Sequence, residues 1–79
     1  MRIDKFLKVS RLIKRRTVAA EACEGGRVKI NGKVCKPSAQ VDIGDEIEIA
    51  FGNRTVRARV LDLADTTRKS EAGELIEYL

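Results

Sequence analysis

The sequence predicts one small α+β domain of 79 residues. Apolar residues recur at helical spacing as far as Cys23, and beyond Gly25-Gly26 they alternate with polar residues, as they do in strands. The dipeptides Asn31-Gly32 and Gly52-Asn53 separate the alternating segments and are typical of tight turns. A chain of this length can bury one modest hydrophobic core, so we expect a single domain.

Two short helices are expected first. Ile3, Phe6, Leu7 and Ser10 recur at helical spacing, which predicts a helix from about residue 2 to 9 with an apolar stripe. The second helix carries its apolar residues at Val18, Ala19, Ala22 and Cys23. Gly25-Gly26 ends this helix, because glycine readily takes the left-handed conformation that follows a helix carboxyl end.

Antiparallel strands are expected next. Residues 27–30 and 33–36 form a hairpin around Asn31-Gly32, and a two-residue turn would place Lys29 opposite Val34. A half-buried strand follows, with its apolar side at Ile47, Ile49 and Phe51 and with Glu46 and Glu48 exposed. After Gly52-Asn53 the chain returns as its partner, with its inward residues at Val56, Ala58 and Val60.

The remaining residues give weaker signals. Residues 65–70 are polar and are expected to be mobile, and residues 71–79 suggest a short helix that Gly73 weakens. We therefore expect one folded domain over residues 1–64 and a partly flexible C-terminal extension over residues 65–79, to which we assign no role beyond packing.

Charge is distributed unevenly along the chain. Residues 1–36 contain eleven Lys or Arg against three acids, whereas residues 37–79 contain five against nine. A domain polarised in this way presents one cationic surface, which suits a polyanion such as nucleic acid. Duplex DNA is the less suitable polyanion, because the helices are short and no dimerising segment is evident to span two half-sites.

Several other classes of protein do not fit. No apolar run approaches the roughly 20 residues needed to cross a bilayer, and no signal peptide is evident, so we expect a soluble, cytoplasmic protein. With no histidine and only Cys23 and Cys35, we expect reduced thiols, no metal and no cofactor. No phosphate-binding glycine loop and no nucleophile paired with a base is present, so we expect no catalysis. We also expect a monomer.

The candidate RNA-binding residues gather around a cationic corner between the helices, residues 10–17. Arg15 and Arg16 offer planar forks that grip phosphate or stack on a base, and Lys14 adds point charge. Thr17 is interpreted as the cap of the second helix, with phosphate contact as its alternative. The complete candidate set is Arg2, Asp4, Lys5, Lys8, Arg11, Lys14, Arg15, Arg16 and Lys29.

Two members of this set leave alternatives open. Asp4 is an acid within a basic helix, and it could simply favour the first turn through the helix dipole. It could also orient Arg2, or accept hydrogen bonds from a base edge or a ribose hydroxyl. Lys29 lies near the hairpin tip and could extend the contact surface beyond the helices.

The sequence resembles the RNA-binding domain named after ribosomal protein S-four, and within it the stand-alone RqcP family of bacterial ribosome-associated quality control, related to heat-shock protein fifteen. The residues that carry the resemblance occur in the family's order and are Arg2-x-Asp4-Lys5-Phe6-Leu7, Arg11-x-x-Lys14-x-Arg16, Glu24-Gly25-Gly26-Arg27-Val28, Asn31-Gly32 and Lys36-Pro37-Ser38. The resemblance implies an αα-hairpin packed on a small, curved, mostly antiparallel sheet, the alpha-L motif.

Function is implied by the same resemblance. Proteins of this family bind the large ribosomal subunit while it carries a stalled peptidyl-tRNA, and they assist an RqcH-type factor that adds alanine to the nascent chain. By position, Arg2 and Arg16 would contact rRNA, Asp4 would lie near the tRNA, and Lys5, Lys8, Arg11, Lys14 and Arg15 would fill the same surface. A ribosome-assembly or stress factor that binds large-subunit rRNA would need the same helices and is the alternative.

Overall fold

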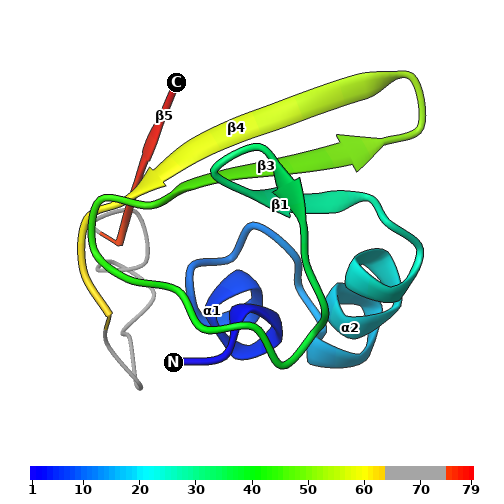
Figure 1. The fold of residues 1–79 in the computed structure, drawn as a ribbon, viewed down its shortest axis with the longest axis horizontal. Helices are drawn as coiled ribbons and strands as arrows, with labels where there is room; N and C mark the ends of the chain where they lie inside the picture. The colour runs from blue at the N-terminus through cyan, green and yellow to red at the C-terminus, as the bar shows by residue number, and fades with distance from the viewer. Residues whose placement is uncertain (64–74) are drawn as a thin grey trace.

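Two helices cover one face of an antiparallel sheet in the computed structural model, which describes residues 1–63 and 75–79 (Figure 1). Helix α1 spans Ile3–Val9 and helix α2 spans Arg16–Glu24. The strands follow in the order β2-β1-β3-β4-β5, and every neighbouring pair is antiparallel. Their bounds are β1 Val28–Ile30, β2 Lys33–Val34, β3 Glu46–Phe51, β4 Arg54–Val60 and β5 Ile76–Tyr78. The α+β architecture predicted from the sequence is confirmed.

The hairpin of β1 and β2 has the predicted register, with Lys29 opposite Val34. Asn31 and Gly32 both have positive φ angles, 51° and 83°, as this two-residue turn requires. The Asn31 side chain also joins the turn to the start of β3: its Oδ1 accepts a hydrogen bond from the Glu46 backbone N–H at 2.9 Å. Asn31 is therefore a structural residue.

The core lies between the helix pair and the sheet. Phe6, Ile3 and Leu7 of α1 are fully buried, and they face strand residues such as Ile47 and Ile49, which are 1% exposed. Ala58 and Val60 complete the buried side of β4, as the alternation predicts. Phe51 ends β3 next to the turn and is 36% exposed, so the apolar alternation continues past the buried part of the sheet.

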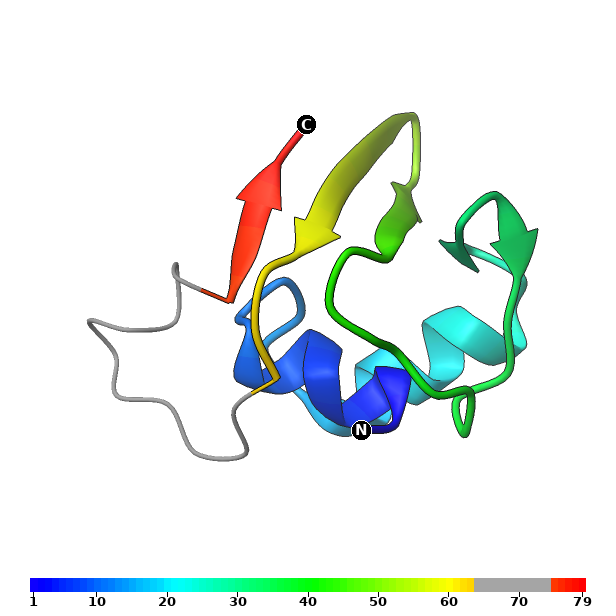
Figure 2. The same ribbon diagram turned by 60° about the vertical axis from the view of Figure 1, so that its left-hand side comes forward.

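The connection between β2 and β3 runs alongside the amino end of the chain (Figure 2). The backbone N–H of Ile3 donates to the carbonyl of Ala39 at 2.7 Å, and that of Val41 donates to the carbonyl of Met1 at 3.0 Å. Arg2 also forms an isolated bridge with Gln40. These backbone bonds hold the first turn of α1 in place and thereby position Arg2 and Asp4.

The C-terminal helix prediction is wrong for residues 75–79. Here β5 pairs with β4, with Tyr78 opposite Ala58 and Ile76 opposite Val60. Leu75 and Ile76 are 3% and 5% exposed, so these residues belong to the core. The open edge of β4 supplies ladder hydrogen bonds and an apolar surface that a short, glycine-weakened helix could not match. Residues 71–74 of that helix, the predicted boundary at residues 64 and 65, and the expected mobility of residues 65–70 lie outside the described residues.

Within the described ranges, no helix has the length and apolar character needed to cross a membrane.

Candidate nucleic-acid interface

Asp4 stands at the centre of the candidate interface, on the first turn of α1. Its side chain is 6% exposed. Oδ2 accepts a hydrogen bond from Arg2 Nη2 at 3.2 Å, and Oδ1 accepts one from Arg16 Nη2 at 3.4 Å. Oδ1 also accepts the backbone N–H of Lys5 at 2.8 Å, which satisfies one of the first-turn donors of α1. We call these residues the Arg2-Asp4-Arg16 cluster.

The cluster presents two oriented guanidinium groups from separate helices. The Arg2 and Arg16 side chains are 48% and 46% exposed. Each uses one terminal nitrogen on Asp4, and a guanidinium has five N–H donors, so each retains the capacity to bind phosphate. Of the alternatives left open for Asp4, the geometry favours the one in which Asp4 orients Arg2. It shows that Asp4 orients Arg16 as well. Burial argues against direct contact of Asp4 with a base edge in this conformation.

The corner between the helices exposes three further cations. Ser10 is the carboxyl cap of α1, and its Oγ donates to the Leu7 carbonyl at 3.3 Å. Arg11 follows in the left-handed region, with φ 64°, and its backbone N–H donates to the Lys8 carbonyl at 3.0 Å. That conformation strains a residue with a Cβ, and strain of this kind is often kept at functional positions. Lys14 and Arg15 are exposed beside it.

The prediction that Thr17 caps α2 is wrong. The cap position is Arg15, with extended φ and ψ angles of −120° and 135°, and no side chain makes a capping hydrogen bond there. Because the helix begins at Arg16, Thr17 is already its second residue. Its hydroxyl therefore does not stand just before the helix, where a capping side chain accepts hydrogen bonds from the backbone N–H groups of the first turn that follows it.

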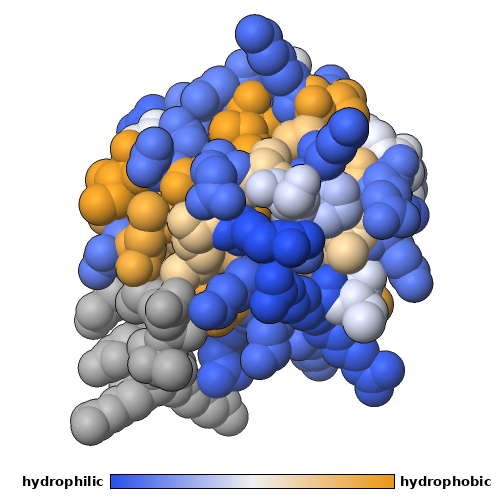
Figure 3. Space-filling view, turned by 60° about the horizontal axis from the view of Figure 1, so that its bottom comes forward, coloured by the Kyte–Doolittle hydropathy of each residue, from blue (hydrophilic) through white to orange (hydrophobic). Residues whose placement is uncertain are grey.

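Seven predicted cations lie on the two helices, at their ends or on the corner between them. Lys8 is exposed and Lys5 is half-buried on α1. The space-filling view from this side shows a broad band of hydrophilic side chains (Figure 3). We call the seven predicted cations the cationic helix surface; they are Arg2, Lys5, Lys8, Arg11, Lys14, Arg15 and Arg16.

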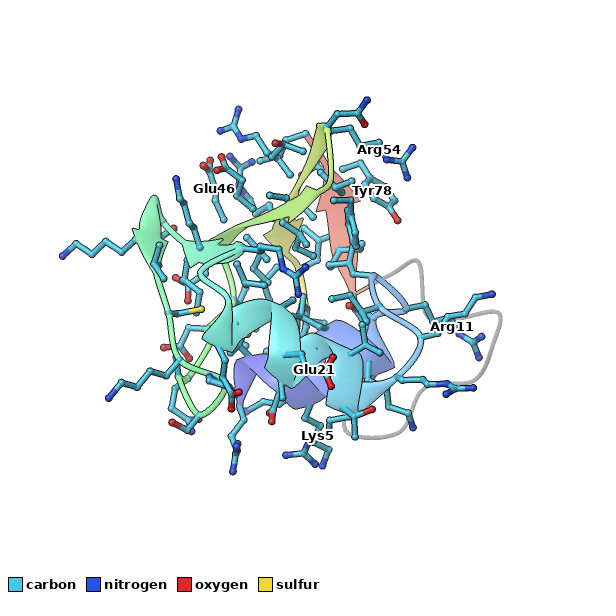
Figure 4. The ribbon with its side chains drawn as sticks, turned by 90° about the vertical axis from the view of Figure 1, so that its right-hand side faces the viewer. Lys5, Arg11, Glu21, Glu46, Arg54 and Tyr78 are labelled. Atoms are coloured by element: carbon cyan, nitrogen blue, oxygen red, sulfur yellow. The ribbon has the colours of Figure 1, made fainter. Side chains whose placement is uncertain are left out.

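Lys29 is not brought together with these residues. It lies on β1 between residues whose side chains face the helices, so it projects from the opposite face of the sheet. There its Nζ is 3.8 Å from Glu48 Oε2, and Arg57 and Arg59 similarly pair with Glu46 at 3.4 Å and 3.1 Å. Figure 4 shows Glu46 on this outer face, away from Lys5 and Arg11. The outer face is therefore lined by pairs of opposite charge, as expected for the exposed glutamates of β3.

A cavity adjoins the cluster, and sequence reasoning missed it. It has a volume of about 720 Å³ and is lined by Arg2 and Asp4 of the cluster, by the carboxyl half of α2 and by residues 34–38. Both thiols, Cys23 and Cys35, are free and lie in its wall. Burial raises the pKa of Cys23 to about 12 and also raises the pKa of Cys35, so both stay neutral at physiological pH. The only sequence signal was Lys36-Pro37-Ser38, which carried part of the resemblance but had no assigned role.

Comparisons with known proteins agree with the resemblance found in the sequence. The S4 domain family matches residues 1–47. The chain is 47% identical over 79 residues to the RQC P-site tRNA stabilizing factor of Streptococcus pneumoniae (strain R6), which covers 100% of this chain and 90% of that protein. With the factor of the same name from Bacillus subtilis (strain 168), the identity is 52% over 79 residues, covering 100% and 92%.

Likeness to heat shock protein 15 is also clear. A homolog from Aeromonas salmonicida is 32% identical over 76 residues, which cover 96% of this chain and 58% of that protein. The trimeric structure of Vibrio cholerae heat shock protein 15 superimposes with a TM-score of 0.92 at 34% identity, covering 100% of this chain and 81% of that one. These similarities confirm the resemblance found in the sequence and the fold that it implied.

Proposed function

The chain belongs to the S4-domain family that includes the RQC P-site tRNA stabilizing factors, and on this premise we propose that it binds rRNA and peptidyl-tRNA on stalled large ribosomal subunits. It acts by binding and performs no catalysis. Its presence on the subunit assists an RqcH-type factor that adds alanine to the nascent chain. It works in the cytoplasm, as a monomer and without a cofactor.

The observation that carries this proposal is the Arg2-Asp4-Arg16 cluster. Its two guanidinium groups come from the amino ends of different helices and are held by one buried carboxylate. Such an arrangement fits two neighbouring phosphates of folded RNA, because bidentate forks bind phosphate with defined geometry. The other cations of the cationic helix surface then follow the RNA backbone on both sides, while Asp4 acts as the positioning residue.

Lys29 has a smaller part in this proposal. A phosphate could attract it only in competition with Glu48, and from the other face of the sheet. We propose that it contacts RNA only where the RNA wraps around the hairpin of β1 and β2.

Likeness to heat shock protein 15 favours a second candidate function. In this alternative, the same cationic helix surface recognises large-subunit rRNA during ribosome assembly or stress, with no part in alanine tailing. The two candidates differ in cells whose ribosomes stall. Loss of the protein reduces alanine tails on nascent chains in the first case and leaves them unchanged in the second.

The direct test is sedimentation of the tagged protein from lysed cells through a sucrose gradient, with Arg16→Ala beside the wild type. We expect the wild type to migrate with free large subunits that carry peptidyl-tRNA, and Arg16→Ala to be lost from them. The expected cost of the substitution is about 1–3 kcal/mol, as for a charge-assisted hydrogen bond at a partly desolvated site.

Arg54→Ala is the matched control, because it also removes one exposed arginine but from β4, away from the cluster. It should stay with the large subunit. Equal losses for both variants would show that only net charge matters and would refute the site. Wild-type protein that remains at the top of the gradient would refute the ribosomal function itself.

A further inference from the structure

The cavity beside the Arg2-Asp4-Arg16 cluster has the size and lining of a small-molecule site. Its volume of about 720 Å³ lies within the roughly 300–1,000 Å³ typical of such sites. Ala20 of α2 and Val34 and Pro37 of the facing segment supply apolar surface. The neutral thiols of Cys23 and Cys35 add to it. A flat aromatic ring can therefore lie against this wall without burying an unpaired charged group.

Charged groups flank this apolar wall. Arg2 lines the cavity from the side of the cluster, and Lys36 lines it from the segment after β2. Both side chains are well exposed, so they remain accessible to a phosphate. Glu24, the last residue of α2, is also exposed and brings a carboxylate to the same cavity. Asp4 also lines the cavity, but its carboxylate is 6% exposed and already accepts from Arg2 and Arg16. Two cations with one exposed acceptor beside an apolar wall match a nucleotide: a backbone with negative charge, and a base with hydrogen-bond donors on its edge.

We propose that this cavity binds an unpaired guanosine extruded from the bound RNA, an inference that rests on the proposed RNA-binding function. The ring lies against the apolar wall, the flanking phosphates contact Arg2 and Lys36, and the Glu24 carboxylate accepts hydrogen bonds from the base. Single-stranded bases splayed out of structured RNA are the usual targets of sequence-specific recognition.

The choice of guanine follows from the chemistry of Glu24. An ionised carboxylate only accepts hydrogen bonds. Guanine is the one RNA base whose Watson–Crick edge places two donors side by side, N1–H and the 2-amino group. Adenine and cytosine place an acceptor next to their amino group, and uracil flanks its single N–H with two carbonyls. Each of these three would bring an acceptor toward the carboxylate.

The experiment compares RNA hairpins of one sequence that carry a single bulged nucleotide, either guanosine or adenosine. Dissociation constants with the full chain are measured by fluorescence anisotropy. We expect wild-type protein to bind the guanosine hairpin roughly tenfold more tightly, the scale of discrimination that one bidentate base contact provides. A hairpin with bulged inosine, which lacks the 2-amino group, should bind with intermediate affinity.

Glu24→Ala and Glu21→Ala form a matched pair, since both residues are exposed on α2 but only Glu24 lines the cavity. Each variant removes one negative charge, so electrostatics alone would tighten RNA binding equally. We expect Glu24→Ala to weaken binding of the guanosine hairpin and abolish the preference, while Glu21→Ala keeps it.

Equal binding of both hairpins by the wild type, or matching behaviour of the two variants, would overturn the guanosine site. Equal binding of both hairpins is also expected if the cavity binds a segment of a protein partner instead of RNA. If co-sedimentation with large subunits persists in that case, the proposed function stands and only this inference fails. Loss of co-sedimentation would instead count against the function.

Discussion

At the scale of single residues, Asp4 connects sequence to function. A carboxylate that is 6% exposed is costly to bury unless it is paired, and here Arg2, Arg16 and the Lys5 backbone N–H supply its partners. Pairing also limits the conformations of two long side chains before RNA arrives. On the proposed function, part of the entropy cost of RNA binding is thus met during folding. An acid that lowers the net charge of an RNA-binding surface can therefore increase its affinity.

Asp4→Asn tests this role. The amide keeps the size of the side chain and an oxygen for the Lys5 N–H, but it removes the charge that holds both guanidinium groups. We expect RNA affinity to fall several-fold, about 1 kcal/mol, although the net charge becomes more positive. Binding to an rRNA fragment, measured by fluorescence anisotropy, checks the prediction. Circular dichroism establishes that the variant is folded.

Asp42→Asn is the control for charge, because Asp42 is exposed in the connection before β3 and lies outside the cluster. It should leave affinity unchanged or slightly higher. Tighter binding by Asp4→Asn than by the wild type would mean that Asp4 acts only through the helix or through repulsion.

At the scale of elements, β5 shows how a weakly patterned segment becomes part of the core. It covers the edge of β4 that would otherwise stay open, and Ile76, together with Leu75 just before the strand, adds a buried side chain to the apolar layer under the sheet. The last residues of the chain thus stabilise the sheet on which the helices pack. The cationic helix surface depends on β5 indirectly, through that packing.

Ile76→Ala should destabilise the protein by about 2–5 kcal/mol, because it removes buried methylene and methyl groups and leaves a cavity. Urea unfolding followed by circular dichroism measures the change. Glu77→Ala on the same strand is the control: its contact with Arg59, 3.9 Å away, is an exposed ion pair, which contributes about 0–1 kcal/mol. If both variants unfold at the same urea concentration, β5 does not stabilise the domain.

At the scale of the whole molecule, the two faces carry charge in different ways. Seven cations share the helix side with Asp4 as the buried acid that orients two of them. On the outer face of the sheet, Lys29, Arg57 and Arg59 are paired with glutamates. On the proposed function, this distribution attracts RNA to the helix side, and the opposite side gives little non-specific attraction.

Salt dependence tests this division. If six or more cations of the cationic helix surface contact phosphate, RNA affinity should fall on the order of a thousandfold between 50 and 200 mM monovalent salt. A plot of the logarithm of the association constant against that of the salt concentration gives the slope. Arg16→Ala should reduce the magnitude of this slope by about one, whereas Arg54→Ala should leave the slope unchanged. A shallow slope for the wild type would exclude the extended phosphate contact.

The sequence by itself determined the features that depend on near neighbours in the chain. Helical spacing predicted α1 and α2, and Gly25-Gly26 marked the end of α2. Asn31-Gly32 gave the hairpin with its register, and alternation gave β3 and β4. The cationic surface followed from composition, because exposed basic residues on two adjacent helices share one side of a small domain.

Only the tertiary structure decided which partners meet across the fold. Asp4 and Arg16 are twelve residues apart, and packing of α1 on α2 makes them neighbours. The pleat of β1 directs Lys29 to the outer face of the sheet, where it meets Glu48. Pairing with the edge of β4 makes residues 76–78 a strand, although their local sequence predicts a helix. The cavity is lined by three separate segments, so it forms only when all three pack together. Local sequence patterns cannot predict such contacts, because the contacts form only when the whole chain folds and buries its apolar surface in one core.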